Sequence, residues 1–171
     1  AGAVILSLAA GGVLAQTEVA KKQAEIRKVT ATSLEKFYKA DPKLKEAVAK
    51  APGYAVFTTY GLSFLIGGAG GKGLAQDNKT KQVTYMDMAQ ASALEMIRSA
   101  EPKIAVVGIG SSVESSVLAA ANLVDAGVPS IWAKALSPEH KRILDRIGVH
   151  HVISPEADSG RRVAHLVNGK L

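Results

Sequence analysis

Residues 103–135 have the sequence KIAVVGIGSSVESSVLAAANLVDAGVPSIWAKA, and this segment determines the fold class. Its first seven residues are almost all apolar, which is typical of a strand buried on both faces of a parallel sheet. A helical pattern follows over 111–126 and ends at Gly127, and a second strand is predicted over 130–135. Strand, helix and strand in this order predict a right-handed βαβ unit.

The same alternation continues towards the C-terminus. The motif SPE at 137–139 predicts the capped start of a helix that runs to Ile147, because Ser caps helices while Pro and Glu suit the first turn. A third short strand is expected over 149–153 and a last helix over 159–167. Residues 103–171 therefore predict an α/β segment with a Rossmann-like parallel half-sheet.

The sequence before this segment indicates a different organisation. A helix is predicted over 17–41, with a capping-box pattern that favours a break near Ala31, and a second short helix follows. Residues 54–88 combine strand-like runs with a glycine-rich stretch and a turn, which predicts antiparallel strands. We expect a separate α+β segment over 17–93, with a boundary at 93–102.

The N-terminal residues are small and apolar. The run over 3–15 carries no charge, and its ending VLA at 13–15 has the small-residue character of a signal-peptide cleavage site. It is too short and too rich in glycine to span a bilayer. We expect a signal-peptide-like segment over 1–16; an apolar helix packed in a core is the alternative.

The composition excludes several classes of protein. The 171 residues carry a net charge of +6, with 47% hydrophobic residues, 21% charged residues and no cysteine. A thiolate zinc site and a cysteine nucleophile are therefore excluded, and wholesale disorder is not expected. The positive charge favours acidic partners. Because only 5% of the residues are aromatic, we expect no platform for stacking nucleic-acid bases.

Two glycine-containing stretches raise the question of phosphate binding. In GGAGGKG at 67–73, Lys72 is followed by Gly73 where a Walker loop needs Ser or Thr, so close strand contacts explain these glycines better. Gly108 and Gly110 have the correct context for a dinucleotide-binding turn, since they follow a buried strand and precede a helix.

This second turn is incomplete as a dinucleotide fingerprint. Val113 replaces the third glycine, and Lys134 stands near the end of the next strand, where an acidic ribose ligand would be sought. The turn would suit the far half of a nucleotide site, with Lys134 near a phosphate or ribose. A tight strand-to-helix turn with no ligand is the alternative.

Acidic and histidine residues near the C-terminus raise the question of a metal. His150 and His151 are adjacent on a predicted strand and point to opposite faces, so they do not suit one ion. Glu156 is the better candidate as a ligand for Mg²⁺ or Ca²⁺, although an acidic residue near a helix N-terminus also explains it. With no nucleophile or paired carboxylates in evidence, we expect no enzyme.

The segment from Ile104 to Leu171 resembles the second half of the RCK (TrkA-N) domain of TrkA/KtrA-type potassium-uptake regulators. The motifs that carry this resemblance are AVVGIGSS, IWAKA and PEAD-x-G. The resemblance implies a Rossmann-like, non-enzymatic module that binds NAD(H), ATP or ADP in the cytoplasm, at the periphery of a membrane potassium channel. The first βαβ half of that family, with its full glycine fingerprint, has no counterpart upstream.

The same resemblance implies a set of site residues. By position, Gly108, Gly110 and Ser111 would form the turn near the nucleotide, and Lys134 would make a polar contact beside it. Glu156 would hold a divalent cation near the nucleotide phosphates.

Residues 17–93 resemble a second family, the bacterial SYLF/Ysc84-like lipid-binding domain. The matching stretches are ADPKLKEAVAKAPGYAVF and FLIGGAGGKGLAQDNKTKQVTYMDMAQAS. This resemblance implies an exported or envelope protein that binds anionic lipid. The basic residues expected to contact the lipid are Lys21, Lys22, Arg27, Lys28 and Lys36.

Together the two resemblances lead us to expect a chimera or fusion of two partial domains, engineered or recombinant. The nucleotide-binding module is the first functional expectation, the lipid-binding module the second, and a chimera without preserved activity the third. A half-sheet leaves the strand at 104–109 with an unpaired edge. Either strands from 54–88 pair with it or two chains associate, and on this ground we expect a homo-oligomer.

Overall fold

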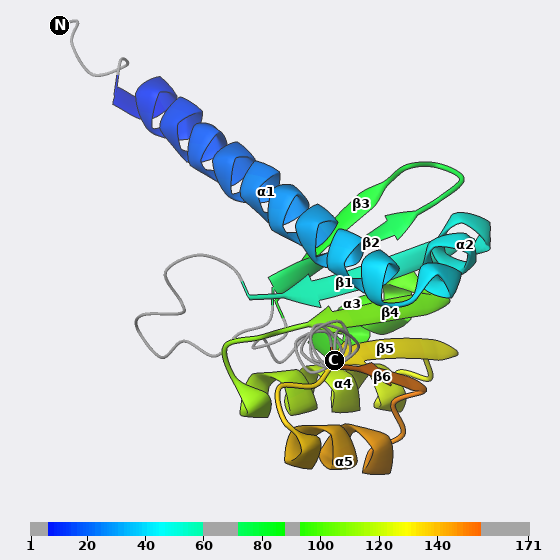
Figure 1. Ribbon diagram of the computed structural model, residues 1–171. Helices are drawn as coiled ribbons and strands as arrows, with labels where there is room; N and C mark the ends of the chain where they lie inside the picture. Colours follow the sequence, from blue (N-terminus) through cyan, green and yellow to red (C-terminus); the bar gives the residue numbers. More distant parts are fainter. Residues whose placement is uncertain (1–6, 60–71, 88–92, 155–171) are drawn as a thin grey trace, which may run out of the picture.

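A six-stranded mixed sheet forms the centre of the protein (Figure 1). The computed structural model describes residues 7–59, 72–87 and 93–154. The strands within these ranges are β1 (Gly53–Thr58), β2 (Lys72–Asp77), β3 (Val83–Asp87), β4 (Ile104–Gly108), β5 (Ser130–Lys134) and β6 (His151–Ile153). The helices are α1 (Ser7–Ala40), α2 (Pro42–Lys50), α3 (Ala93–Ala100), α4 (Val113–Asp125) and α5 (Pro138–Arg146).

The predicted α/β alternation is confirmed from β4 to β6. These three strands are parallel neighbours joined by α4 and α5. Ser112 and Ser137 cap the two helices, each accepting a hydrogen bond from a backbone N–H in the first turn. Gly127 and Gly148 end them with φ angles of +74° and +97°, in the left-handed region that favours glycine.

The sheet extends through strands from the first half of the chain. The order is β3-β2-β1-β4-β5-β6, and β1 pairs with β4 in parallel, from Tyr54 opposite Ile104 to Thr58 opposite Gly108. Both β1–β2 and β2–β3 are antiparallel pairs, as the glycine-rich segment predicted. Strand pairing within one chain thus covers the edge of β4, and the expected boundary at 93–102 falls inside a continuous sheet.

Helices cover both faces of the sheet and form two apolar clusters. On one face, α1 and α2 pack on the sheet through residues such as Phe37, Leu44 and Trp132. On the other, α3, α4 and α5 pack through residues such as Ile97 and Leu123. Each fully buried side chain of this size stabilises the fold by about 1.5–3 kcal/mol. The mixed α/β class predicted from the sequence is therefore confirmed as a layered, Rossmann-like arrangement.

The helix predicted over 17–41 has no break. The capping-box prediction near Ala31 is wrong, because α1 continues through it to Ala40. Two threonine hydroxyls donate hydrogen bonds back along the helix: Thr30 Oγ1 to Ile26 O at 2.7 Å and Thr32 Oγ1 to Lys28 O at 3.0 Å. Such bonds let threonine stay within a helix rather than start one.

Two expectations concern the ends of the chain. The signal-like segment over 1–16 overlaps the start of α1, whose described part begins at Ser7. Within the ranges that the structure describes, no helix is both long and apolar enough to cross a membrane. The helix predicted over 159–167 lies outside those ranges.

Candidate nucleotide-binding edge of the sheet

The carboxyl ends of β1 and β4 define the most promising position for a ligand. The strand order matches that of a doubly wound sheet, in which ligands bind outside the carboxyl ends of the strands where the winding reverses. In this chain that point lies between β1 and β4. This chain departs from that arrangement at β2, which runs antiparallel to β1 and to β3.

Hydroxyl groups join the ends of these two strands. Thr58 Oγ1 donates to Gly108 O at 3.4 Å, and the N–H of Gly110 donates to Thr59 Oγ1 at 3.4 Å. The hydroxyls of Thr59 and Ser111 lie 3.0 Å apart. The predicted site residues Gly108, Gly110 and Ser111 therefore lie together in one turn that is attached to β1.

The two glycines of the turn have different surroundings. A Cβ on Gly108 would collide with Ser33 Oγ and would lie 3.6 Å from the ring of Phe37, both on α1. The close packing of α1 thus explains the glycine at 108 without a ligand. A Cβ on Gly110 would lie 3.7 Å from Lys134 Nζ, with no other described atom among its close neighbours. Among the described residues, Gly110 therefore leaves space beside its Cα at the edge.

Gly110 and Lys134 combine with the start of α4 to make a site suited to an anion. Lys134 is the last residue of β5, and its ammonium group reaches the turn after β4. Ser112 Oγ accepts the N–H of Ser115 at 3.1 Å, which satisfies one of the free N–H groups of the first turn. The remaining groups, the helix dipole and the lysine all favour negative charge.

A second polar pair lies further along the same edge. Lys72 is opposite Thr58 in the β1–β2 pair and opposite Asp87 in the β2–β3 pair. Lys72 Nζ and Asp87 Oδ2 are 3.6 Å apart, and both side chains are half-buried. Sequence reasoning missed this pair, because it considered Lys72 only as part of a phosphate loop. The strand-like runs within 54–88 predicted strands there but not their register.

The neighbouring histidines have separate structural roles. His150 Nδ1 accepts the N–H of Ile131 at 3.1 Å, and the ring of His151 stacks on Trp132 at 4.0 Å. Burial and the neighbouring His150 lower the pKa of His151. Among the residues that the structure describes, no three His, Asp or Glu side chains could share a metal ion. Glu156, the predicted cation ligand, lies outside those residues.

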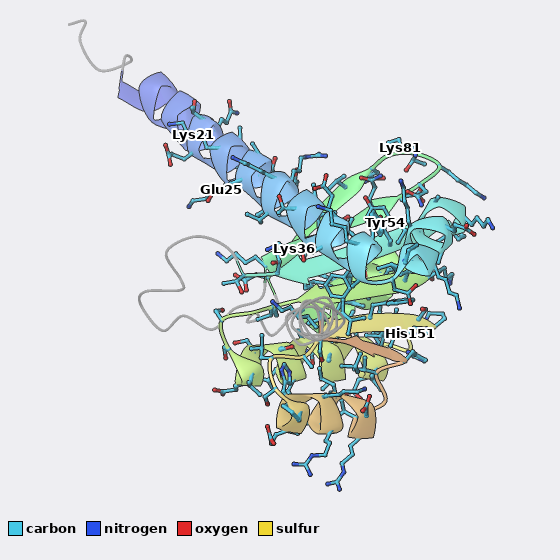
Figure 2. The ribbon with its side chains drawn as sticks, in the orientation of Figure 1. Lys21, Glu25, Lys36, Tyr54, Lys81 and His151 are labelled. Atoms are coloured by element: carbon cyan, nitrogen blue, oxygen red, sulfur yellow. The ribbon has the colours of Figure 1, made fainter. Side chains whose placement is uncertain are left out.

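The basic residues expected to contact lipid lie along α1. Figure 2 shows Lys21 and Glu25 on the part of α1 that projects beyond the sheet, whereas Lys36 lies nearer the sheet. Lys21 forms an exposed ion pair with Glu18 at 3.2 Å. Arg27 instead donates to the hydroxyl of Tyr85 on β3 at 2.6 Å, so it helps to hold α1 on the sheet.

Comparison with known proteins agrees with the fold. The architecture is that of a Rossmann-like α/β domain. Residues 73–155 match the family model of the TrkA-N domain. This match contains β4, α4, β5, α5 and β6, and with them the turn after β4 and Lys134.

Three relatives illustrate the similarity. Ktr system potassium uptake protein A of Vibrio alginolyticus is 44% identical over 59 residues, which are 34% of this chain and 27% of the relative. Ktr system potassium uptake protein C of Bacillus subtilis is 37% identical over 60 residues, 35% of this chain and 27% of the relative. The uncharacterized protein MG323 of Mycoplasma genitalium is 32% identical over 97 residues, 54% of this chain and 42% of the relative. The chain thus spans about a quarter to two-fifths of these relatives.

The TrkA-N resemblance of the C-terminal segment is therefore supported, and the match extends further upstream than predicted. It begins at Gly73 in β2, inside the segment that resembled the SYLF domain. None of these comparisons supports a SYLF part or a chimera. A single sheet that includes both segments gives no structural reason to divide the chain there.

Proposed function

We propose that this chain is a non-enzymatic, nucleotide-binding regulatory domain of a potassium-uptake system. The observation that carries the proposal is the turn after β4, where Lys134 Nζ is close to Gly110, α4 begins, and no other described atom would lie within 4 Å of a Cβ at 110. The turn lies in the region that matches the TrkA-N domain, and two of the relatives above are named as Ktr potassium uptake proteins. The proposed ligand is NAD(H), ATP or ADP.

The phosphates of the nucleotide would bind between Lys134 and the first turn of α4. The backbone N–H of Ser111 would then face the same oxygens, because glycine at 110 allows the backbone to approach closely, whereas the N–H of Gly110 donates to Thr59 Oγ1. Glu156 would hold a divalent cation beside the phosphates. Lys134 and the turn at Gly110 fit an anionic ligand by charge and position, and we assign none of these residues the role of a catalytic acid, base or nucleophile.

Regulation would follow from the position of the ligand between β1 and β4. A nucleotide that binds one arrangement of this edge more tightly shifts the population towards that arrangement. The proposed partners are further copies of this chain and a membrane potassium-channel subunit, to which the domain would attach at the cytoplasmic side.

Calorimetric titration of the chain with ADP, ATP and NADH tests this proposal. We expect at least one nucleotide to bind, and Lys134→Gln to weaken that binding about tenfold, because one charge-assisted contact to phosphate is removed. Lys45→Gln is the matched control, since Lys45 is an exposed lysine on α2. If none of the three nucleotides binds, or if both substitutions have equal effects, the proposal is wrong.

A further inference from the structure

A threonine from the first half of the chain contacts the turn that follows β4. Thr59 is the residue after β1, and its Oγ1 accepts the N–H of Gly110 at 3.4 Å. The same oxygen lies 3.0 Å from the hydroxyl oxygen of Ser111. One side chain therefore contacts two successive residues of the turn that we propose to bind phosphate. Thr59 lies outside residues 73–155, which match the TrkA-N domain.

The pairing of β1 with β4 brings Thr59 to this place. The two strands are parallel and stay in register up to Thr58 opposite Gly108, so the residues that follow them leave the sheet at the same edge. Thr58 is buried, and its hydroxyl donates to Gly108 O at 3.4 Å. Thr58 thus belongs to the packed end of the sheet, whereas the hydroxyl of Thr59 contacts the turn.

The hydroxyls of Thr59 and Ser111 can form one hydrogen bond with each other, which uses one of their two hydrogens. Each hydroxyl carries one hydrogen and two lone pairs. Whichever of the two donates, the hydrogen of the other can donate to a further acceptor. A phosphate bound beside Lys134 would lie next to this pair, because Lys134 Nζ is close to Gly110, which precedes Ser111. Phosphate oxygens accept such hydrogen bonds.

We propose that Thr59 is a positioning residue of the nucleotide site: it fixes the backbone of Gly110 and orients the hydroxyl of Ser111, so that this pair of hydroxyls donates to a phosphate oxygen. The inference rests on the proposed nucleotide-binding function and adds to it a residue that the family match does not contain. Both halves of the chain then build the site, because Thr59 follows β1 while the turn follows β4.

Calorimetric titration of the full chain with ADP tests the role of Thr59. Thr59→Val removes the hydroxyl and keeps a β-branched side chain, so we expect ADP to bind about tenfold more weakly to a variant whose circular dichroism is unchanged. Thr59→Ser keeps the hydroxyl, and its dissociation constant should stay within about threefold of that of the unmodified chain. Thr84→Val is the matched control and should not change binding, because Thr84 is an exposed threonine on β3, opposite Ala75.

The outcomes separate this inference from the proposed function. Equal binding of ADP by the unmodified chain and by folded Thr59→Val overturns the inference and leaves the proposed function intact. Thr59→Ser binding as weakly as Thr59→Val also overturns it, because the hydroxyl is then not what binding requires. If ADP, ATP and NADH all fail to bind the unmodified chain, both are wrong. If Thr59→Val does not fold, Thr59→Ala replaces it, with the same expected loss and the same contradicting outcome.

A double-mutant cycle tests whether Thr59 acts through Ser111. Ser111→Ala alone should weaken ADP binding about fivefold, because one hydrogen bond to phosphate is removed. The variant with both Thr59→Val and Ser111→Ala should lose clearly less affinity than the product of the two single losses, since Thr59→Val already misplaces the Ser111 hydroxyl. Losses that multiply would mean that the two residues act independently, which overturns the inference.

Discussion

Gly108 and Gly110 are two residues apart, and they are glycines for different reasons. At Gly108 the space of a Cβ is taken by Ser33 and Phe37 of α1. At Gly110 the one described neighbour of a Cβ is the end of the flexible Lys134 side chain. A motif that indicates nucleotide binding in the sequence thus contains one glycine required by packing and one available to a ligand.

This difference predicts opposite effects of alanine. Gly108→Ala should destabilise the fold by about 1–3 kcal/mol, because the new methyl group overpacks the contact with Ser33. Gly110→Ala should change stability by less than about 0.5 kcal/mol but should weaken nucleotide binding. Urea unfolding measures the first effect, and titration with ADP measures the second. Recovery of part of the lost stability in Gly108→Ala with Ser33→Ala would confirm the contact as its cause.

His140 provides a prediction about pH. Its side chain is 1% exposed, and its Nδ1 accepts the N–H of Leu136 at 3.1 Å. Burial lowers the pKa of His140, so the unfolded chain takes up a proton first as the pH falls. The contribution of neutral His140 to stability is therefore complete above about pH 6.5 and is lost progressively below it, with a slope of at most about 1.4 kcal/mol per pH unit.

Substitution of His140 should reduce the pH dependence of the free energy of unfolding. His140→Asn retains a group that can accept the N–H of Leu136 but has no titration in this range. We expect urea unfolding free energies of the variant to differ less between pH 5 and pH 7 than those of the unmodified chain. Some dependence should remain, because burial also lowers the pKa of His151. An unchanged dependence would show that His140 does not titrate as inferred.

Helix α5 shows how a short element depends on its first turn. Ser137 Oγ accepts the N–H of His140 at 3.1 Å, and Leu144 is fully buried near the other end of the helix. A helix of nine residues has little stability of its own, so its cap and its packing must supply it. Ser137→Ala should therefore lower the free energy of unfolding by about 1 kcal/mol, measured with urea. Ser137→Asp should keep most of the stability, and equal losses would contradict the capping role.

Local patterns predicted the elements well where they contain their own boundary signals. The cap signal at Ser137 and the glycines at 127 and 148 allowed the ends of α4 and α5 to be predicted closely, although the cap at Ser112 was not predicted. The break predicted in α1 shows the opposite case. The residues TSLE at 32–35 carry the capping-box signal of a helix start, but packing of Ser33 and Leu34 against the sheet keeps the helix continuous.

The relation between the two halves of the chain could not be read from local sequence. The pairing of β1 with β4 joins residues about 50 positions apart, and no turn or spacing encodes that register. The sequence predicted that Gly110, Ser111 and Lys134 lie near one another, because parallel strands end at a common edge. It did not predict Lys72 beside Asp87, since that contact depends on the reversed direction of β2.

The continuous sheet predicts that the described strands unfold together. Because β1 is central and contacts both β2 and β4, neither half of the sheet is complete alone. Fluorescence of Trp132, the single tryptophan, and circular dichroism should give the same urea midpoint. Val56→Ala in β1 should shift both midpoints equally. Two separate transitions would instead support independent domains with a boundary near 93–102.

The contact between Ser33 and Gly108 also gives α1 a mechanical role. Ser33 of α1 packs against Gly108 at the end of β4, while the N-terminal part of the helix continues beyond the sheet (Figure 1). At 1.5 Å per residue, the part from Gln16 to Ser33 is about 25 Å long. A ligand that displaced the turn after β4 towards α1 would therefore tilt this helix through the contact at Ser33. Because Arg27 also binds the hydroxyl of Tyr85, such a tilt would have to stretch or break that hydrogen bond between α1 and β3.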